Sequence, residues 1–170
     1  MKFDADFEYR TGLGIDLHRL VEGRRLILGG VRIPSDVGLL AHSDGDVVIH
    51  AVIDAMLGAM CMGDIGEFFP DTDPNYENAD SRKLLSFVSE LMSSEKWEIV
   101  NLDLVIKAEQ PKLSQYKPQI KRSIADLACM NFANVNVKAK TNEGFGAVGR
   151  SEAIEAMAIV LLRRRLKRGL

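Results

Sequence analysis

Cysteine is scarce in this chain of 170 residues: only Cys61 and Cys129 occur, and they form no C-x-x-C pair. Two cysteines this far apart lack the spacing of a clustered metal site or a redox motif. In a reducing compartment a free cysteine behaves as a small hydrophobic residue. We therefore expect both cysteines to be buried and structural.

Long apolar runs and a strong charge imbalance are also absent. No stretch reaches the about 18 to 20 apolar residues that span a bilayer, and the start of the chain, MKFDADFEYR, lacks the apolar core of a signal peptide. The net charge of −2 gives no overall electrostatic footprint for nucleic acid. The basic cluster of residues 163–165, Lys167 and Arg168 is expected to end a helix, where cations complement the helix dipole. These features predict a cytoplasmic protein that binds neither a membrane nor nucleic acid.

What the chain does have is the composition of a globular domain, with 46% hydrophobic and 27% charged residues. No linker or repeat divides it, so we predict one domain over residues 1–170, with residues 1–8 as a flexible N-terminal extension. Hydrophobic periodicity predicts strands at residues 8–20, 25–33, 97–108 and 133–140, and helices at residues 44–60, 81–96, 112–130 and 151–165. Ser43 or Asp44 is the expected N-cap of the first helix. This order predicts an α/β fold, an α+β two-layer sandwich in which a mixed sheet packs on helices.

Histidine occurs only in the first 50 residues, at His18, His42 and His50. Asp16 and His18 are two residues apart, so on a strand their side chains point to the same face. His50 lies in an apolar helix, where an imidazole without a partner is costly. Two imidazoles and a carboxylate are a common zinc set with a fourth position open for substrate, and Asp46 is expected to accept the other ring N–H of His50. From these residues alone, a metal site and ordinary structural histidines stay equally open.

Two polar loops follow the first helix. The loop at residues 63–80 carries three carboxylates, Asp64, Asp71 and Asp73. They suit a cation or the hydroxyl groups of a polyol, but they are also ordinary turn formers. The glycine-rich turn at residues 141–150 offers backbone N–H groups and Arg150 to an anion, and Glu143 to Mg²⁺. It lacks the spacing of a Walker A or dinucleotide-binding motif.

Longer segments are more specific than these single residues. LLAHSDGDVVIH at residues 39–50 precedes GDIGEFFPDTDP at residues 63–74, and the chain also contains GIDLH, GGVRIP, ADSRKLL, AEQPKL and VNVKAKTNEG. Together these segments resemble the 2-C-methyl-D-erythritol 2,4-cyclodiphosphate synthase family of the non-mevalonate isoprenoid pathway. The resemblance runs from Arg10 to the last predicted helix.

The resemblance implies a phosphorus–oxygen lyase. The 2-phosphate of 4-diphosphocytidyl-2-C-methyl-D-erythritol 2-phosphate would attack the β-phosphorus of the same molecule and release CMP. The zinc ligands it implies are Asp16, His18 and His50. It associates Glu143 with a second cation, Mg²⁺ or Mn²⁺, at the substrate diphosphate. The catalytic residues it implies, which stabilise the transition state, are His42 and Thr141.

Substrate contacts are implied at further positions. On the metal side they are Asp16, His18, His42 and Ser43. In the loop that faces ribose and methylerythritol they are Asp64, Ile65, Gly66, Phe69, Asp71 and Asp73. At the cytidine and diphosphate they are Ala108, Pro111, Lys112, Leu113, Lys140, Thr141, Asn142, Glu143 and Arg150.

The resemblance also implies a homotrimer whose active sites lie between subunits, with the metal side from one chain and the cytidine pocket from its neighbour. The chain departs from the family pattern at Ala147, Ser151 and Ala153, positions that affect an apolar cavity on the threefold axis and not the active site. Two alternatives stay open. One is a zinc-dependent phosphohydrolase that activates water with the same ligands, and the other is a non-catalytic metal- or metabolite-binding trimer.

Overall fold

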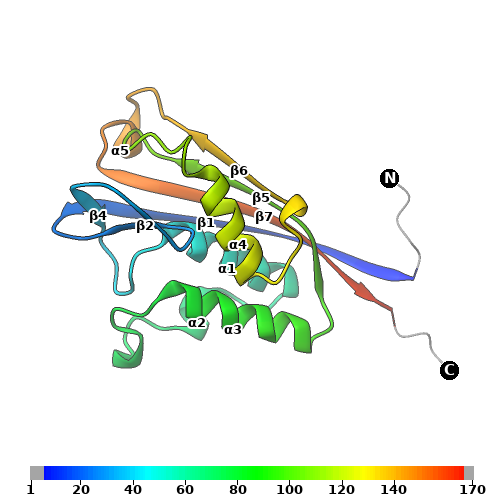
Figure 1. Ribbon diagram of the computed structural model, residues 1–170. Helices are drawn as coiled ribbons and strands as arrows, with labels where there is room; N and C mark the ends of the chain where they lie inside the picture. Colours follow the sequence, from blue (N-terminus) through cyan, green and yellow to red (C-terminus); the bar gives the residue numbers. More distant parts are fainter. Residues whose placement is uncertain (1–5, 167–170) are drawn as a thin grey trace.

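A five-stranded mixed sheet with helices on one face forms the framework of the chain, in a computed structural model that describes residues 6–166 (Figure 1). In sheet order, the strands are β4 (Val37–Leu39), β1 (Phe7–Glu22), β7 (Ala153–Arg165), β5 (Glu98–Lys107) and β6 (Val135–Lys140). Only β5 and β6 pair in parallel, and the other neighbours are antiparallel. A separate hairpin joins β2 (Leu26–Leu28) to β3 (Val31–Ile33). The predicted α+β architecture with a mixed sheet is confirmed.

Three longer helices cover the sheet: α1 (Val47–Met60), α3 (Ser81–Ser94) and α4 (Lys117–Leu127). Shorter helical turns are α2 (Ile65–Phe68), α5 (Gly146–Gly149), η1 (Pro74–Tyr76) and η2 (Phe132–Asn134). Helix α1 begins later than the sequence predicts, because the side chain of Asp46, and not that of Ser43 or Asp44, accepts the free N–H groups of its first turn. Within residues 6–166, no helix has the length and apolar character needed to cross a membrane.

Helix α1 packs directly on β1 through main-chain atoms. A Cβ atom added at Gly14 would lie 2.0 Å from the carbonyl oxygen of Ala51. One added at Gly12 would lie 1.9 Å from the carbonyl oxygen of Ala55. Only glycine, which has no Cβ, lets the two backbones approach this closely. The contact fixes the height of α1 above β1 and brings His50 beside that strand.

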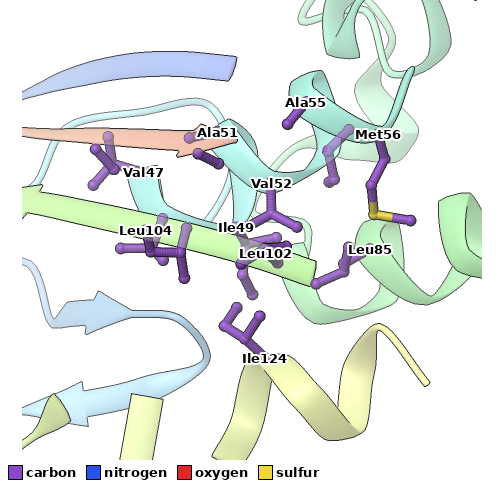
Figure 2. Packing of buried hydrophobic residues seen from close by; sticks show 14 of the residues in the cluster. Val47, Ile49, Ala51, Val52, Ala55, Met56, Leu85, Leu102, Leu104 and Ile124 are labelled. Carbon is purple, nitrogen blue, oxygen red and sulfur yellow. The ribbon is translucent and has the colours of Figure 1, made fainter. Parts of the chain in front are cut away.

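The hydrophobic core lies between α1, the covered face of the sheet, and helices α3 and α4. Figure 2 shows residues of α1 gathered around Leu102 and Leu104 of β5, with Leu85 of α3 and Ile124 of α4 beside them. These four side chains are at most 1% exposed. Burial of one large aliphatic side chain stabilises a fold by about 1.5–3 kcal/mol, so this cluster holds α1 firmly against the sheet.

The structure has a strand, β7, where the sequence predicts a helix at residues 151–165, so this prediction is wrong. On the covered face of β7 the buried residues are Ile154, Ala156, Ala158, Val160 and Leu162. The residues between them are also largely apolar, since they include Met157, Ile159 and Leu161. When both faces of a central strand are apolar, the hydrophobic pattern of its sequence does not alternate. Such a pattern cannot be distinguished from that of a buried helix.

The arginines at the end of β7 do not complement a helix dipole, which corrects a second expectation. Arg163 and Arg164 form ion pairs with glutamates of β5 and β1, at 3.0 and 2.7 Å. The guanidinium groups of Arg10 and Arg164 lie 4.9 and 4.4 Å from the ring centroid of Trp97, which is 3% exposed. The other basic residues of the cluster, Lys167 and Arg168, lie outside the described residues.

Two further expectations need correction. Cys61 and Cys129 are exposed and not buried, and each adopts a positive φ, 60° and 51°, just beyond a helix. Phe7 and Glu8, which the sequence assigns to an N-terminal extension, form the start of β1. Residues 1–5 of that expected extension lie outside the described residues.

The face of the sheet opposite the helices carries exposed apolar side chains. On β1 and β7 they are Leu13, Ile15, Leu17 and Ile159, each between 50% and 56% exposed. Leu13 and Ile159 are direct partners in the strand register, so these side chains form one continuous patch.

Candidate active site

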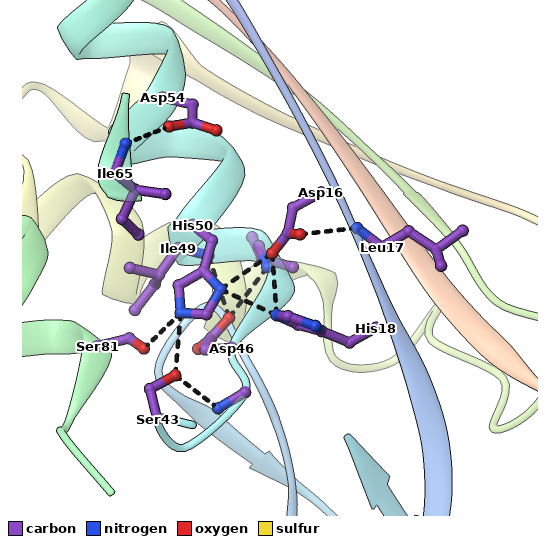
Figure 3. Close-up of polar contacts among 12 residues, drawn as sticks. Asp16, Leu17, His18, Ser43, Asp46, Ile49, His50, Asp54, Ile65 and Ser81 are labelled. Atoms are coloured by element: carbon purple, nitrogen blue, oxygen red, sulfur yellow. Dashed lines mark hydrogen bonds and ion pairs between the residues drawn. The ribbon is translucent and has the colours of Figure 1, made fainter. Parts of the chain in front are cut away.

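Three side chains from β1 and α1 meet at the edge of the helix layer (Figure 3). Asp16 and His18 point to the same face of β1, as predicted, and His50 approaches them from α1. Asp16 Oδ2 lies 3.1 Å from His18 Nε2 and 2.9 Å from His50 Nδ1, and the two ring nitrogens are 3.1 Å apart. The other carboxylate oxygen of Asp16 accepts the N–H of Leu17 at 2.8 Å, which turns Oδ2 toward the histidines.

This donor set fits a divalent transition metal. Zinc bonds of about 2.0–2.1 Å in a tetrahedron place neighbouring ligand atoms about 3.3 Å apart. The three observed separations of 2.9–3.1 Å need only a small expansion to reach that value. Within residues 6–166, this is the only group of three or more such ligand atoms close enough to share an ion.

In the metal-free protein, the negative charge of Asp16 and a positive charge on His50 stabilise each other. Burial opposes ionisation of Asp16, but hydrogen bonds from His18 and His50 outweigh it and hold the pKa of that carboxyl well below its usual range. Burial likewise opposes protonation of His50, but the hydrogen bond and charge of Asp16 outweigh it and raise the pKa of His50. The site therefore favours a positive charge between its ligand atoms.

The ring nitrogens of His50 find their hydrogen-bond partners in residues other than Asp46 throughout the described part of the chain, so the predicted role of Asp46 beside that histidine is wrong. Its carboxylate accepts four backbone N–H groups, from Gly29, Gly30, Val48 and Ile49, at 2.5–3.2 Å. Burial raises the pKa of Asp46 to about 6 in spite of these bonds. Asp46 thus joins the β2–β3 turn to the N-terminus of α1, and the partner of His50 Nε2 comes from elsewhere.

A cavity of about 410 Å³ opens beside the three ligand residues. The predicted site residues that line it are Asp16, His18, His42, Ser43, His50, Ile65, Gly66, Phe69 and Asp71. Asp64 and Asp73 do not line it; instead they cap α2 and η1 by accepting the N–H groups of Glu67 and Asn75.

The sequence reasoning missed Asp54, which lines the cavity and follows His50 by four residues on the same face of α1. Burial raises the pKa of Asp54, whose carboxylate accepts the N–H of Ile65 at 2.8 Å.

The loop that carries His42 and Ser43 is held from outside the cavity. Arg24 donates to the carbonyl oxygens of Ala41 and Ser43, at 3.2 and 2.7 Å, on either side of His42. The N–H of Asn78 donates to the carbonyl oxygen of His42 at 2.7 Å. These bonds fix the backbone of the loop, and the side chain of His42 faces the cavity.

A second group of predicted site residues lies at the carboxyl ends of the parallel strands β5 and β6. Ala108, Pro111, Lys112 and Leu113 follow β5. Lys140 is the last residue of β6, and Thr141, Asn142, Glu143 and, beyond α5, Arg150 follow it. The N–H of Ala108 donates to the carbonyl oxygen of Lys140 at 2.9 Å, and Thr141 Oγ1 donates to a carboxylate oxygen of Glu143 at 2.5 Å. Arg150 forms an exposed ion pair with Glu152 at 2.9 Å.

The structure of one chain does not bring the two groups together. In the strand register, Asp16 is opposite Ala156, Ala156 is opposite Ile106, and Ile106 is opposite Ala139 at the end of β6. Three strand spacings of about 4.8 Å separate Asp16 from Ala139 by about 14 Å. No residue of the second group lines the cavity beside His18 and His50, as far as the described residues show.

Comparison with known proteins identifies the family. The YgbB family matches residues 9–163. A Clostridium perfringens protein named 2-C-methyl-D-erythritol 2,4-cyclodiphosphate synthase is 50% identical over 153 residues, which are 90% of this chain and 98% of that relative. The chain belongs to this synthase family. A second family member, from Geobacillus sp. (strain WCH70), is 52% identical over 157 residues, or 92% of this chain and 99% of that relative.

Solved structures of the synthase family have the same fold. A CDP-bound synthase is 40% identical, with a TM-score of 0.83, over 90% of this chain and 99% of that chain. The bifunctional IspDF from Campylobacter jejuni is 41% identical with a TM-score of 0.89; the match covers 93% of this chain and 43% of that longer chain. The family resemblance inferred from the sequence motifs is confirmed.

Proposed function

We propose that this chain cyclises 4-diphosphocytidyl-2-C-methyl-D-erythritol 2-phosphate to 2-C-methyl-D-erythritol 2,4-cyclodiphosphate and releases CMP. The observation that carries the proposal is the shared cavity: the candidate ligands Asp16, His18 and His50 open onto the same space as His42 and Ser43. Relatives that are about 50% identical over 90% of the chain are named as synthases of this product.

Asp16 Oδ2, His18 Nε2 and His50 Nδ1 would hold Zn²⁺ or another divalent transition metal. The two imidazoles and one carboxylate are a zinc donor set that would leave a coordination position for substrate, and all three residues line the cavity. Glu143 would hold Mg²⁺ or Mn²⁺ together with the substrate diphosphate. When bound, such cations neutralise phosphate charge and polarise phosphoryl oxygens.

The reaction needs no strong general base from the protein, because the attacking 2-phosphate is already an anion. The obstacle is the repulsion between two negative phosphates that must meet in line. His42 and Ser43 would hold the 2-phosphate, and Thr141 would steady the β-phosphate as charge develops in the transition state. Fixing both ends of one substrate molecule also supplies proximity, which lowers barriers by up to ~7–11 kcal/mol in favourable intramolecular reactions.

The remaining substrate contacts would come from two loops. Around the ribose and methylerythritol we assign Asp64, Ile65, Gly66, Phe69, Asp71 and Asp73. For the cytidine and diphosphate we assign Ala108, Pro111, Lys112, Leu113, Lys140, Asn142 and Arg150. The position of this second set supports the assignment, because ligands of open α/β sheets bind beyond the carboxyl ends of parallel strands.

The active unit would be a homotrimer with active sites between subunits. Two observations support this arrangement. The open face of the sheet carries the apolar patch of Leu13, Ile15, Leu17 and Ile159, and exposed patches of this kind mark association surfaces. Asp16 also lies about 14 Å from the end of β6 within one chain, so a neighbouring chain would complete the site.

Phosphorus NMR of the reaction with the CDP-linked substrate tests the activity. We expect the signals of a cyclic diphosphate and of CMP to appear together. A linear monophosphate product would instead indicate a metal-dependent phosphohydrolase. If no turnover occurs with Zn²⁺ and Mg²⁺ present, while the substrate still binds, the chain is a non-catalytic metabolite-binding protein.

Mixing two inactive variants tests the shared site. His42→Ala removes a group on the metal side, and Thr141→Ala removes one on the nucleotide side. If chains assort at random into trimers, about one quarter of the interfaces regain both groups, and the same fraction of activity should return. Continued inactivity of the mixture, with trimers present by light scattering, would place both groups in one chain's site.

A further inference from the structure

The ring of His50 has a second polar edge, turned away from the candidate metal position. Its Nε2 atom lies 3.0 Å from Ser81 Oγ and 3.2 Å from Ser43 Oγ (Figure 3). Ser81 is the first residue of α3 and is 0% exposed, and His50 is 8% exposed. The hydroxyl of Ser81 also donates to a carboxylate oxygen of Asp44 at 2.5 Å. Asp44, which is half-buried, and the buried Ser81 and His50 therefore form a chain of hydrogen bonds.

The direction of these bonds follows from what each group is able to donate. An ionised carboxylate only accepts, so the single hydroxyl hydrogen of Ser81 goes to Asp44. Toward His50, Ser81 Oγ then acts only as an acceptor. The hydrogen bond between Ser81 Oγ and His50 Nε2 therefore requires a hydrogen on Nε2. In a neutral imidazole the other nitrogen, Nδ1, is then a bare acceptor.

In this neutral form, the Nδ1 atom would face another acceptor, Asp16 Oδ2, which lies 2.9 Å away. Two lone pairs at this distance repel unless a proton or a cation lies between them. His18 Nε2, 3.1 Å from Nδ1, converges on the same point. The hydrogen-bond chain on one edge of the ring thus prepares the other edge for a positive ion.

We propose that Asp44 and Ser81 are positioning residues, which hold His50 in the tautomer with hydrogen on Nε2 so that Nδ1 is presented to the metal. The inference rests on the proposed metal site and adds two residues to it. Carboxylates and hydroxyls that orient a metal-bound histidine in this way commonly change metal affinity 10- to 100-fold when they are removed.

The position of the pair is fixed by more than the bond to His50. The other carboxylate oxygen of Asp44 accepts the backbone N–H of Ser81 at 3.2 Å, and the N–H of Asp44 donates to the carbonyl oxygen of Ala79 at 3.0 Å. Asp80 caps the start of α3. The N-terminus of α3 is thereby tied to the loop that carries His42 and Ser43, and Ser81 keeps one orientation toward the ring.

The test compares serine variants within α3. Ser81→Ala should weaken Zn²⁺ binding about 10- to 100-fold, measured by competition with a chromophoric chelator. Ser81→Thr keeps the hydroxyl and should stay within a few-fold of the unmodified protein. Ser89→Ala is the matched control, because Ser89 is 5% exposed on the same helix and its hydroxyl donates to the carbonyl oxygens of Leu85 and Leu127, away from His50. It should leave Zn²⁺ affinity unchanged even if it lowers the melting temperature.

Long-range proton–nitrogen NMR of the histidine rings gives a readout that does not depend on metal loading or on any variant. In the metal-free protein, at a pH where His50 is neutral, we expect hydrogen on Nε2; in Ser81→Ala and Asp44→Asn the Nδ1–H form should gain population. Hydrogen on Nδ1 in the unmodified protein would overturn the inference. So would Zn²⁺ affinity that is equal in Ser81→Ala and Ser89→Ala.

These outcomes separate the two proposals. If the unmodified protein binds Zn²⁺ tightly and Ser81→Ala binds it equally well, the positioning role is refuted and the metal site stands. If the unmodified protein binds no Zn²⁺, the metal site and the positioning role toward it both fail, whichever tautomer the spectra show.

Discussion

Replacing Gly14 with alanine should push α1 away from β1 and damage both the fold and the metal site. The new Cβ would lie 2.0 Å from the carbonyl oxygen of Ala51, whereas real Cβ atoms essentially never come closer than 3.0 Å to such an atom. Helix and strand would therefore have to separate by at least the difference, about 1 Å. No side-chain rotation relieves the clash, because both partners belong to the backbone.

The expected loss of stability is about 3 kcal/mol, at the upper end of the 1–3 kcal/mol that overpacking typically costs. For a chain of 170 residues this corresponds to a fall in melting temperature of roughly 6–12 °C. Zn²⁺ binding should suffer as well, since Ala51 directly follows His50 and metal sites tolerate only about 0.2 Å of error in ligand distances.

Thermal unfolding followed by circular dichroism, with a Zn²⁺ titration of the same samples, measures both effects. Gly58→Ala is the control within α1: its Cβ would meet nothing within 4 Å, so it should stabilise the helix by up to about 1 kcal/mol. Gly12→Ala makes an equally close contact at Ala55, farther along α1 from His50. It should lose similar stability with less effect on the metal. A Gly14→Ala protein with unchanged melting temperature and Zn²⁺ affinity would refute the reasoning.

Three shorter predictions concern the cavity and its ligands. His18→Ala should lose bound Zn²⁺ by elemental analysis while keeping its far-ultraviolet circular dichroism, and stoichiometric retention of zinc would contradict the ligand assignment. In the metal-free protein, the lowered pKa of Asp16 and the raised pKa of His50 should stabilise the fold most between about pH 4 and pH 6.5. The His50 contribution should fade as pH rises through its raised pKa, and that of Asp16 as pH falls from about 4 toward its lowered pKa. Urea unfolding of metal-free protein across this range measures both, and equal stability at roughly pH 6 and pH 9 would argue against the pair. Arg24→Gln should free the carbonyl groups on either side of His42 and lower kcat about 10- to 100-fold with Zn²⁺ affinity unchanged; unaltered steady-state kinetics would show that the loop needs no such clamp.

The candidate ligands could be predicted because their geometry is local. Asp16 and His18 are two residues apart on a strand, and that spacing fixes their common face whatever surrounds them. The position of Asp54 beside the cavity could have been predicted in the same way, since Asp54 follows His50 by one helical turn. Ser81 was not, because its contact with Asp44 joins positions 37 residues apart and depends on how α3 packs.

The last strand shows where sequence periodicity stops being informative. Alternation marks a strand only when its two faces differ in polarity. The faces of β7 are both apolar, one beneath the helices and one in the exposed patch around Ile159, so the pattern carries no period of two. The distance between the two groups of site residues could not be predicted either. It depends on the strand order, which is a property of the whole sheet.

The tryptophan held between Arg10 and Arg164 is an optical probe of one end of this sheet. It is the chain's only tryptophan, and Arg10 precedes Asp16 by six residues along β1, a distance of about 20 Å. Its fluorescence emission should therefore change when this end of the sheet unfolds. It should not change when an ion binds near Asp16. Fluorescence unfolding curves and Zn²⁺ titrations of one sample thus give two separate signals, so damage to the fold can be distinguished from damage to the site in any variant.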